Sequence, residues 1–184
     1  GAPGMQQVVA PHARVRVFVD TNVILEAFRV GCWSSLATTF SIETVEKCVE
    51  EALTGDPTDP RHVAVDRDVL VAGLSARHPV DKRTIARFGL AHPASAGLDA
   101  GELHLLAWLH DQGLMGTVKL LLSTADKAAI VAAGRLDWLD LVTSLEQLAQ
   151  QAGVGRVQID QMARHYRQRW LDEIKVKVRL GIIP

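Results

Sequence analysis

Four acidic residues stand at positions where an α/β fold could gather them into one site: Asp20, Glu46, Glu102 and Asp126. Asp20 directly follows a short valine-rich run at residues 15–19, and Asp126 closely follows a second apolar run at residues 118–122. Carboxylate oxygens are the ligands that Mg²⁺ and Mn²⁺ prefer in proteins. An ion held in this way can bind a phosphodiester, help to form hydroxide from water and stabilise the leaving oxygen. The chemistry that these residues indicate is therefore phosphodiester hydrolysis.

The elements that must position the acids are short buried strands, each followed by a helix. Residues 15–19 are too few and too rich in valine for a convincing helix, so they predict a buried parallel strand. The carboxyl ends of parallel strands meet at one edge of the sheet, where such folds bind their ligands. Thr21 or Asn22 is expected to cap the helix that follows the first strand. Acids that are far apart in the sequence are then expected to converge at this edge.

The remainder of the chain alternates between predicted strands and helices. Further strands are predicted at residues 37–42, 118–122 and 140–142. Helices are predicted at residues 43–53, 66–77, 81–90, from residue 98 to about 109, from residue 127 to about 134, and after a cap at Thr143 or Ser144. The predicted fold is a three-layer α/β/α sandwich with a parallel sheet of about four or five strands. Residues 5–152 form its single domain, with a helical insert at about residues 55–97.

The pattern changes after residue 152, and residues 153–184 are predicted to form a basic amphipathic helical extension. Residues 156–179 hold seven lysines or arginines against three acids. Two sets of cations could bind RNA phosphates, one in this extension and one in the insert: Arg164, Arg167 and Arg169, and Arg77, Lys82 and Arg83. Tyr166 and Trp170 could stack on bases. The other interpretation of the extension is a solvated helix whose apolar side contacts the domain or a second subunit.

Composition limits the classes of function. The 184 residues are 48% hydrophobic with a formal charge of −1, which is sufficient for one core and gives no global field for a polyanion. Cys32 and Cys48 lack zinc-site spacing, and no long apolar segment is present, so we expect a reduced, cytoplasmic protein with no membrane association. Residues 1–4 are interpreted as a vector-derived remnant. Haloacid-dehalogenase chemistry needs a second Asp where this chain has Asn22.

Each acid also has a purely structural interpretation. Glu46 lies in a predicted surface helix among other glutamates, and Asp20 and Asp126 could each cap a helix. Asp99 and Glu102 have the spacing of a capping box, which by itself accounts for both. The combination of all four acids at strand and helix ends favours a functional interpretation over four independent structural ones.

Three motifs resemble those of the PIN-domain nucleases, a family that includes VapC-type toxins of toxin-antitoxin pairs and nucleases of RNA processing. Val-Phe-Val-Asp-Thr-Asn at residues 17–22 is similar to the family's opening strand. Leu-Asp-Ala-Gly-Glu at residues 98–102 is similar to its helix-opening motif, and Leu-Leu-Ser-Thr-Ala-Asp at residues 121–126 to its threonine-x-aspartate ending. The matching pieces cover most of residues 15–148. The insert is longer than compact toxins carry, and the third acid is Glu102 where many members have Asp.

The resemblance implies a role for each matching residue. It implies that the catalytic acids and metal ligands are Asp20, Glu46, Glu102 and Asp126. It also implies that the supporting residues are Asn22, Asp99 and Thr124. Glu46 is the best match to the second acid, and Glu43 or Glu50 could take its place. The implied protein is a Mg²⁺- or Mn²⁺-dependent endoribonuclease, as the toxin of a toxin-antitoxin system or in RNA processing. Its expected partners are an RNA substrate, an antitoxin protein and a second copy of the chain.

Two alternatives stay open at this point. The chain could be a PIN-like module that has kept its acids but binds nucleic acid or assembles with other proteins. It could also be a structure-specific DNA nuclease, which would use the same acids on a different polymer. Tight metal binding is expected of an enzyme and not of the binding module. The polymer that is cleaved distinguishes a DNA nuclease from a ribonuclease.

Overall fold

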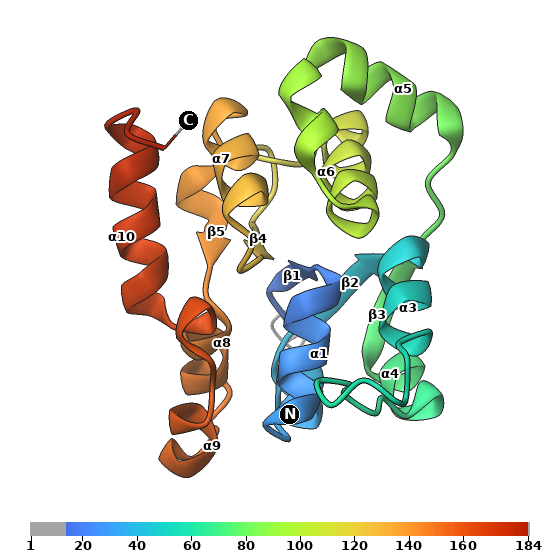
Figure 1. The fold of residues 1–184 in the computed structure, drawn as a ribbon, viewed down its shortest axis with the longest axis vertical. Coiled ribbons are helices and arrows are strands. Elements are labelled where there is room, and N and C mark those ends of the chain that lie inside the picture. The colour runs from blue at the N-terminus through green and yellow to red at the C-terminus, as the bar shows by residue number, and fades with distance from the viewer. Residues whose placement is uncertain (1–13, 184) are drawn as a thin grey trace, which may run out of the picture.

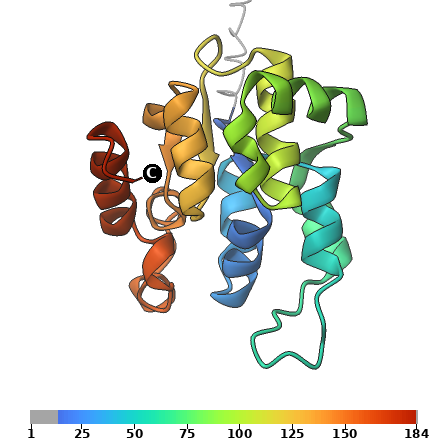
Figure 2. The ribbon, with the colours of Figure 1, turned by 45° about the horizontal axis from the view of Figure 1, so that its top comes forward.

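A computed structural model describes residues 14–183, which form one sheet of five parallel strands between layers of helices (Figures 1 and 2). The strands are β1 Arg16–Val19, β2 Ser41–Val45, β3 Leu74–His78, β4 Leu120–Ser123 and β5 Val142–Thr143. Their order across the sheet is β3-β2-β1-β4-β5. This confirms the predicted α/β/α sandwich and its parallel sheet. Residues 1–4, interpreted as a remnant, lie outside the described residues.

The strand order creates a switch point between β1 and β4. From β1 the chain builds outward through β2 and β3, then crosses back and adds β4 and β5 on the other side of β1. In open α/β sheets, ligands bind in the crevice that forms at such a reversal, beyond the carboxyl ends of the strands. The register pairs Val19 with Ser123, so β1 and β4 end side by side. The topology thus places the residues that follow these two strands at the position where a site is expected.

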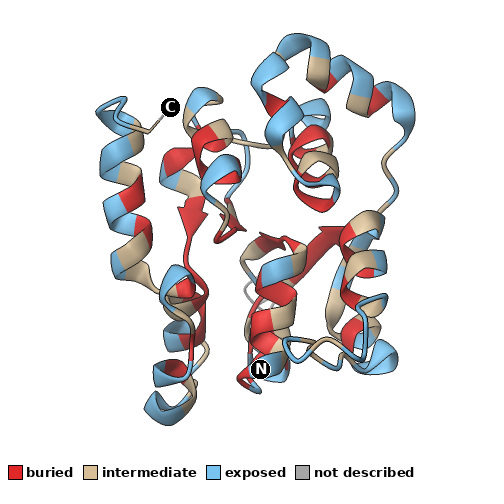
Figure 3. Ribbon diagram, in the orientation of Figure 1, coloured by how far each residue is buried: buried red, intermediate tan, exposed pale blue. Residues whose placement is uncertain are grey.

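Helices cover the sheet and bury its central strands. They are α1 Thr21–Arg29, α2 Trp33–Thr39, α3 Glu46–Leu53, α4 Arg67–Gly73, α5 Lys82–Ala91, α6 Ala100–Gln112, α7 Lys127–Arg135, α8 Leu145–Gln151, α9 Arg156–Asp160 and α10 Gln168–Arg179. Short 3₁₀ turns occupy Pro93–Gly97, Leu139–Leu141 and Arg164–Tyr166. Phe18, Ile42 and Leu122 on the three central strands are fully buried, and Figure 3 shows these strands mostly in red, whereas β3 at the edge has no buried residue. Strands enclosed on both faces have near-continuous apolar runs, which explains the valine-rich start of the chain.

The second strand lies further along the chain than its prediction. Residues 37–39 finish α2, whose Leu36 faces the core, and the strand begins only at Ser41. The predicted strand at residues 37–42 and the predicted start of the next helix at residue 43 are therefore wrong. The strand is hard to recognise from sequence because a polar pair such as Glu43 and Thr44 is unusual inside a buried strand. Both are satisfied here, since Thr44 Oγ1 donates to the Val19 carbonyl at 2.6 Å and Glu43 binds Arg16.

The predicted insert is not wholly helical. The helix predicted at residues 66–77 ends at Gly73, and the next five residues form β3, which pairs with β2 at the edge of the sheet. Its side chains alternate between half-buried and exposed positions, so the apolar content is too low to identify a strand from a short window. Part of the segment that was predicted to be a helical insert therefore forms one strand of the sheet.

The C-terminal segment is helical, as predicted, and it belongs to the same hydrophobic cluster as the sheet. Ile159, Met162, Tyr166, Leu171 and Ile174 are all buried in that cluster. Helix α10 packs against α7 and α8, at the opposite side of the molecule from α5 in Figure 1. Among residues 14–183, no helix combines the length and the apolar character needed to cross a membrane.

Candidate acidic site

Asp20 occupies the end of β1 and ties it to the end of β4. Its side chain is 1% exposed. One carboxylate oxygen, Oδ1, accepts the backbone N–H of Val23 at 3.0 Å and so caps α1, in place of the predicted caps Thr21 and Asn22. The other, Oδ2, accepts the hydroxyl of Thr124 at 2.5 Å. Thr124 therefore orients the carboxylate of Asp20.

Asp126 lies beside this pair at the start of α7. Its side chain accepts the backbone N–H of Ala129 at 2.9 Å, and its own backbone N–H donates to Thr124 Oγ1 at 3.3 Å. The Thr124 hydroxyl thus contacts both aspartates. It donates its hydrogen to Asp20, and its oxygen accepts the backbone N–H of Asp126. Asp20 and Asp126 do cap helices, so their structural interpretation is correct. It does not account for their meeting at a shared threonine.

Glu102 lies in the first turn of α6, where it is 5% exposed. It completes the predicted capping box, in which the Asp99 backbone N–H donates to Glu102 Oε2 at 3.3 Å. Asp99 itself is exposed. Glu102 is close enough to the strand-end acids for the charges of Asp126 and Asp20 to act on its ionisation.

A fourth acid, Glu51 of α3, joins this group and was missed by the sequence analysis. Its Oε2 accepts the hydroxyl of Thr21 at 2.7 Å, and its Oε1 accepts the backbone N–H of Gly101 at 3.0 Å. Thr21 follows Asp20 and Gly101 precedes Glu102, so Glu51 connects the two. A Cβ added at Gly101 would lie 2.6 Å from Glu51 Oε2 and 2.9 Å from Thr21 Oγ1. A side chain at position 101 would therefore displace the Glu51 carboxylate, and glycine preserves its contacts.

The three glutamates considered for this position lie elsewhere. Glu46 has an exposed side chain that pairs with Arg77 at 3.6 Å. Glu50 is exposed and pairs with Lys47. Glu43 is buried within β2 against Arg16 and His78. The structure brings none of them to Asp20, whereas Glu51 is one of the charges that act on Asp20.

Local sequence could not distinguish Glu51 from Glu46. The buried face of α3 is formed by Cys48, Val49 and Ala52. At 3.6 residues per turn, Glu46 and Glu51 flank this face on opposite sides at similar angles. Which of them faces Asp20 depends on the side of α3 that packs against α1 and α6, and that is a long-range feature of the fold.

The electrostatics of the site are unusual because the charges that act on Asp20 and Glu102 come from other acids. Burial raises the pKa of Asp20 to about 6, against the lowering effect of hydrogen bonds from Thr124 and Val23, while Asp126 and Glu51 raise it further. Burial likewise raises the pKa of Glu102 to about 8, with Asp126, Asp20 and Asp99 adding to the effect. Every charge that acts on these two carboxyl groups is negative. A cation placed among them would relieve this repulsion.

The donor atoms suit a hard divalent cation, although a complete set of protein ligands is not assembled. Within residues 14–183, no group of three or more Asp, Glu, His or Cys side chains has the arrangement of a metal site. Mg²⁺ usually keeps several waters and is bound through one or two carboxylates together with substrate phosphates. Oxygen ligands, burial and uncompensated negative charge therefore fit such an ion.

No protein-family model matches the chain, and no curated protein matches it. The arguments for its function consequently rest on the fold and on the geometry of the acids.

The other predicted site residues lie apart from the acids or are already paired. Asn22 is exposed on α1. Arg164 and Arg169 both pair with Glu173, at 3.8 and 3.6 Å, and Arg167 pairs with Glu146 and Asp160, each at 3.4 Å. Lys82 and Arg83 are exposed at the start of α5. The pairs of Arg164 and Arg169 are exposed and therefore weak, so these two cations stay available to a phosphate backbone, whereas Arg167 is half-buried between its acids.

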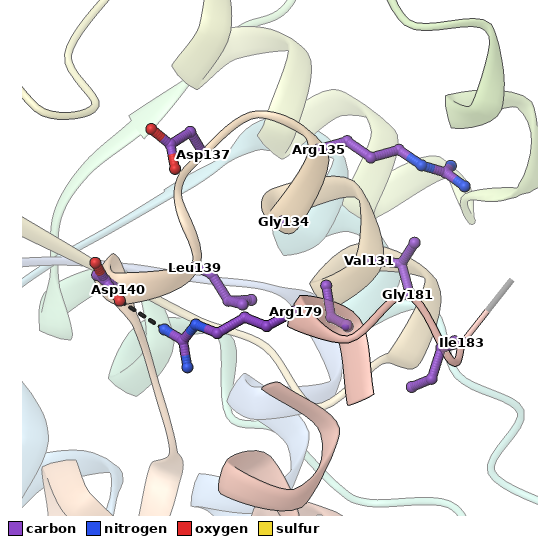
Figure 4. Close-up of a pocket in the computed structure, with 10 residues that line it drawn as sticks. Val131, Gly134, Arg135, Asp137, Leu139, Asp140, Arg179, Gly181 and Ile183 are labelled. Atoms are coloured by element: carbon purple, nitrogen blue, oxygen red, sulfur yellow. Dashed lines mark hydrogen bonds and ion pairs between the residues drawn. The ribbon is translucent and has the colours of Figure 1, made fainter. Parts of the chain in front are cut away.

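A cavity of about 450 Å³ lies at the end of α7 that is remote from Asp126 (Figure 4). An ion pair between Arg179 and Asp140, at 2.6 Å, closes one side of it. Its lining comes from α7, the connection to β5 and the end of α10: Val131, Gly134, Arg135, Asp137, Leu139, Asp140, Val178, Arg179, Gly181 and Ile183. It shares no residue with the acidic site.

Proposed function

We propose that this protein is a Mg²⁺- or Mn²⁺-dependent endoribonuclease of the PIN type. The observation that carries the proposal is the meeting of four acids from separate segments at the switch point of a parallel sheet: the buried Asp20 and Glu102 and the half-buried Glu51 and Asp126. Such a crevice is where α/β folds bind ligands, and acids kept there without a cationic partner suit a metal ion.

The chain's own groups divide into ligands and positioning residues. Asp20, Glu102 and Asp126 would hold the ion, directly or through water, and Glu51 would complete the set in place of Glu46. Thr124 fixes the carboxylate plane of Asp20 through its hydroxyl. The backbone N–H of Gly101 and the hydroxyl of Thr21 fix Glu51. A bound Mg²⁺ or Mn²⁺ would supply polarisation of the phosphodiester and a lowered pKa of water.

The proposed partners follow from the same charges. An RNA backbone would approach the acids only together with a cation, and the exposed Lys82 and Arg83 could contact its phosphates. If the protein is the toxin of a toxin-antitoxin pair, an antitoxin could silence it by placing an arginine among the carboxylates, since arginine and carboxylate form strong charge-assisted hydrogen bonds.

A second candidate function is a PIN-like binding or assembly module that performs no catalysis. The specific observation in its favour is that no three acidic, histidine or cysteine side chains within residues 14–183 form a ready metal site. Under this proposal the acids would bind metal weakly and without consequence for RNA. Metal affinity and cleavage together separate the two functions.

The deciding experiment is a cleavage assay on labelled single-stranded RNA, structured RNA and single-stranded DNA, each with Mg²⁺, Mn²⁺ or EDTA. The comparison is between wild type and Asp20→Asn. The amide oxygen of Asn can still accept the Val23 N–H, so the α1 cap and the fold should persist, which circular dichroism verifies. RNA cleavage that requires metal and disappears in the variant is the expected result. Equal cleavage by both proteins would refute the site, and a folded wild type that cuts none of the polymers would favour the binding module.

A further inference from the structure

Two histidines meet on a surface of the molecule that the acidic site does not include. His92 follows α5 as its C-terminal cap, and His110 lies in the last turn of α6. These two helices pack together in the upper right of Figure 1. The Nε2 atoms of the two rings are 3.3 Å apart, the ring centroids are 5.0 Å apart and the ring planes are inclined at 82°.

The surrounding side chains hold both rings in place. Phe88 is 1% exposed, and its ring centroid lies 5.3 Å from that of His92 and 5.5 Å from that of His110. The ring centroid of Trp138 lies 6.4 Å from that of His110. Because Phe88 belongs to the core, the two histidines rest on a rigid apolar support. Preorganised ligands of this kind lose little freedom when they bind.

The spacing of the two nitrogens is that of neighbouring ligands on one ion. Zinc binds histidine nitrogen at about 2.0–2.1 Å in a tetrahedron, so two of its nitrogen ligands stand roughly 3.3 Å apart. A direct head-on contact between the rings would place the centroids further apart than 5.0 Å, because each centroid lies behind its own nitrogen. The rings are instead inclined to each other at 82°, and two imidazoles on one tetrahedral ion would have a centroid separation close to this one.

The chemistry of the pair agrees with this geometry. A metal needs the neutral imidazole. Imidazole suits Zn²⁺, Cu²⁺ and Ni²⁺ better than it suits Mg²⁺. Asp111, the residue next to His110, is held by Arg87 at 3.0 Å and is not counted as a ligand.

We propose that His92 and His110 form a binding site for a divalent transition-metal ion of the Zn²⁺ type, whose remaining coordination positions are filled by water. The site differs from the acidic one in both ligand chemistry and place. Glu102 and His110 lie eight residues apart on α6, which corresponds to roughly 12 Å along the helix axis. An ion bound here would link the end of α5 to α6. The proposal is independent of the nuclease function.

The test is isothermal titration of the full chain with Zn²⁺ in the presence of excess Mg²⁺, which occupies oxygen-ligand sites. The proteins compared are wild type, His92→Ala, His110→Ala and, as a matched control, His165→Ala on the exposed turn before α10. Both cysteines are buried and should not compete for the ion. We expect one equivalent of Zn²⁺ bound by wild type and by His165→Ala. Loss of an outer-sphere partner alone costs metal sites about 10- to 100-fold in affinity, so loss of either ligand should cost at least that.

Three results would overturn the proposal. One is the absence of Zn²⁺ binding by wild type, which would leave the pair as a hydrogen bond between the two rings. Another is binding that survives both His92→Ala and His110→Ala. The third is binding that disappears in Asp20→Asn, which would move the ion to the acidic site. Thermal melts of each variant establish that it is folded, and His92→Asn replaces His92→Ala if the smaller side chain loosens the end of α5.

Discussion

Glu43 and two acids of the candidate site, Asp20 and Glu102, are buried to a similar extent, yet their surroundings are opposite. Glu43 is 5% exposed, and its oxygens accept Arg16 Nε at 2.6 Å, Arg16 Nη2 at 3.1 Å and His78 Nε2 at 2.9 Å. Burial would raise the pKa of Glu43, but these hydrogen bonds and charges outweigh it, and the pKa lies below its usual value. For Asp20 and Glu102 the pKa rises, because burial raises it and the charges of the neighbouring acids raise it further.

The comparison teaches that burial of an acid does not by itself indicate function. Glu43 is neutralised within the protein and joins β2 to β1 and β3. The acids at the switch point leave their charge uncompensated, which costs stability and is retained where an external cation can be bound. The following predictions test whether these two environments differ in this way.

The largest expected effect separates Glu51 from Glu46. Gln at position 51 can still accept the Gly101 N–H, so the structure should persist while one carboxylate charge is lost. We expect Glu51→Gln to reduce RNA cleavage by at least about 100-fold, the upper range for loss of a group that supports a metal site. Glu46→Gln is the matched control and should cleave like wild type. If the control loses activity and Glu51→Gln keeps it, the second acid has been assigned wrongly.

A pH-dependent gain in stability is expected for Glu102→Gln. The pKa of Glu102 is about 8 in the folded protein against 4.5 in the unfolded chain. Between these values the folded state retains a proton that the unfolded state has lost, so stability falls as pH rises through this window and is constant above it. The cost above pH 8 is on the order of 3 to 5 kcal/mol. Urea unfolding should therefore show the variant more stable than wild type at pH 8.5 and equal at pH 4.

The effect of Mg²⁺ on the stability of wild type and of Glu102→Gln tests this prediction further. At pH 8.5 the ion should recover part of the lost stability in wild type and have little effect on Glu102→Gln. An equal stabilisation of both proteins would show that the ion binds elsewhere.

Removing Arg16, the cation that pairs with Glu43, should lower the stability of the protein, whereas Glu102→Gln should raise it. Arg16→Met leaves Glu43 with the hydrogen bond to His78 as its remaining side-chain contact of this kind. Breaking a buried pair costs more than an exposed one, and since Arg16 is 34% exposed we expect a loss of about 2 kcal/mol. Because the pKa of Glu43 is lowered, this contribution is present at neutral pH and disappears as pH falls below 4.5. Denaturant melts at pH 7 and pH 3 measure both values.

A double variant controls this experiment. Arg16→Met with Glu43→Gln removes both charges, so it should be more stable than Arg16→Met alone at pH 7. A double variant as unstable as the single one would show that packing of the Arg16 stem, and not the buried charge, is responsible.

The smallest effect is expected at Ser123, the last residue of β4. Its hydroxyl is fully buried, and within the described part of the chain it has no hydrogen-bond partner. An unpaired buried hydroxyl carries a desolvation cost, so Ser123→Ala should raise the free energy of unfolding by about 1 kcal/mol. Thermal melts with Thr143→Ala as comparison can measure this gain. A clear loss of stability would mean that the hydroxyl has a partner, such as a bound water.

The parts of the molecule that follow local rules could be predicted from the sequence. The strand ending in Asp20, the capping box of Asp99 and Glu102, and the cap at Ser144 each depend on a few neighbouring residues. The α/β/α architecture followed from the repetition of such units. Asp20, Glu102 and Asp126 were placed at the right ends of their elements for the same reason.

What could not be predicted depends on contacts between distant segments. β3 is recognisable only through its pairing with β2, because its own five residues are mostly polar. Glu43 suits a buried strand only because Arg16 lies on the neighbouring strand. Glu51 reaches the site through Thr21 and Gly101, which are 30 and 50 residues away.

Both edges of the sheet oppose its extension by another strand. At one edge, β5 is two residues long, and Lys175 of α10 donates to the Val142 carbonyl at 2.6 Å. At the other, the exposed Arg77 and the following Pro79 make β3 a poor template, since charged and proline residues discourage pairing at an edge. Two copies of this chain that associate should therefore meet through their helices, and the folded protein should resist aggregation through edge-to-edge strand pairing.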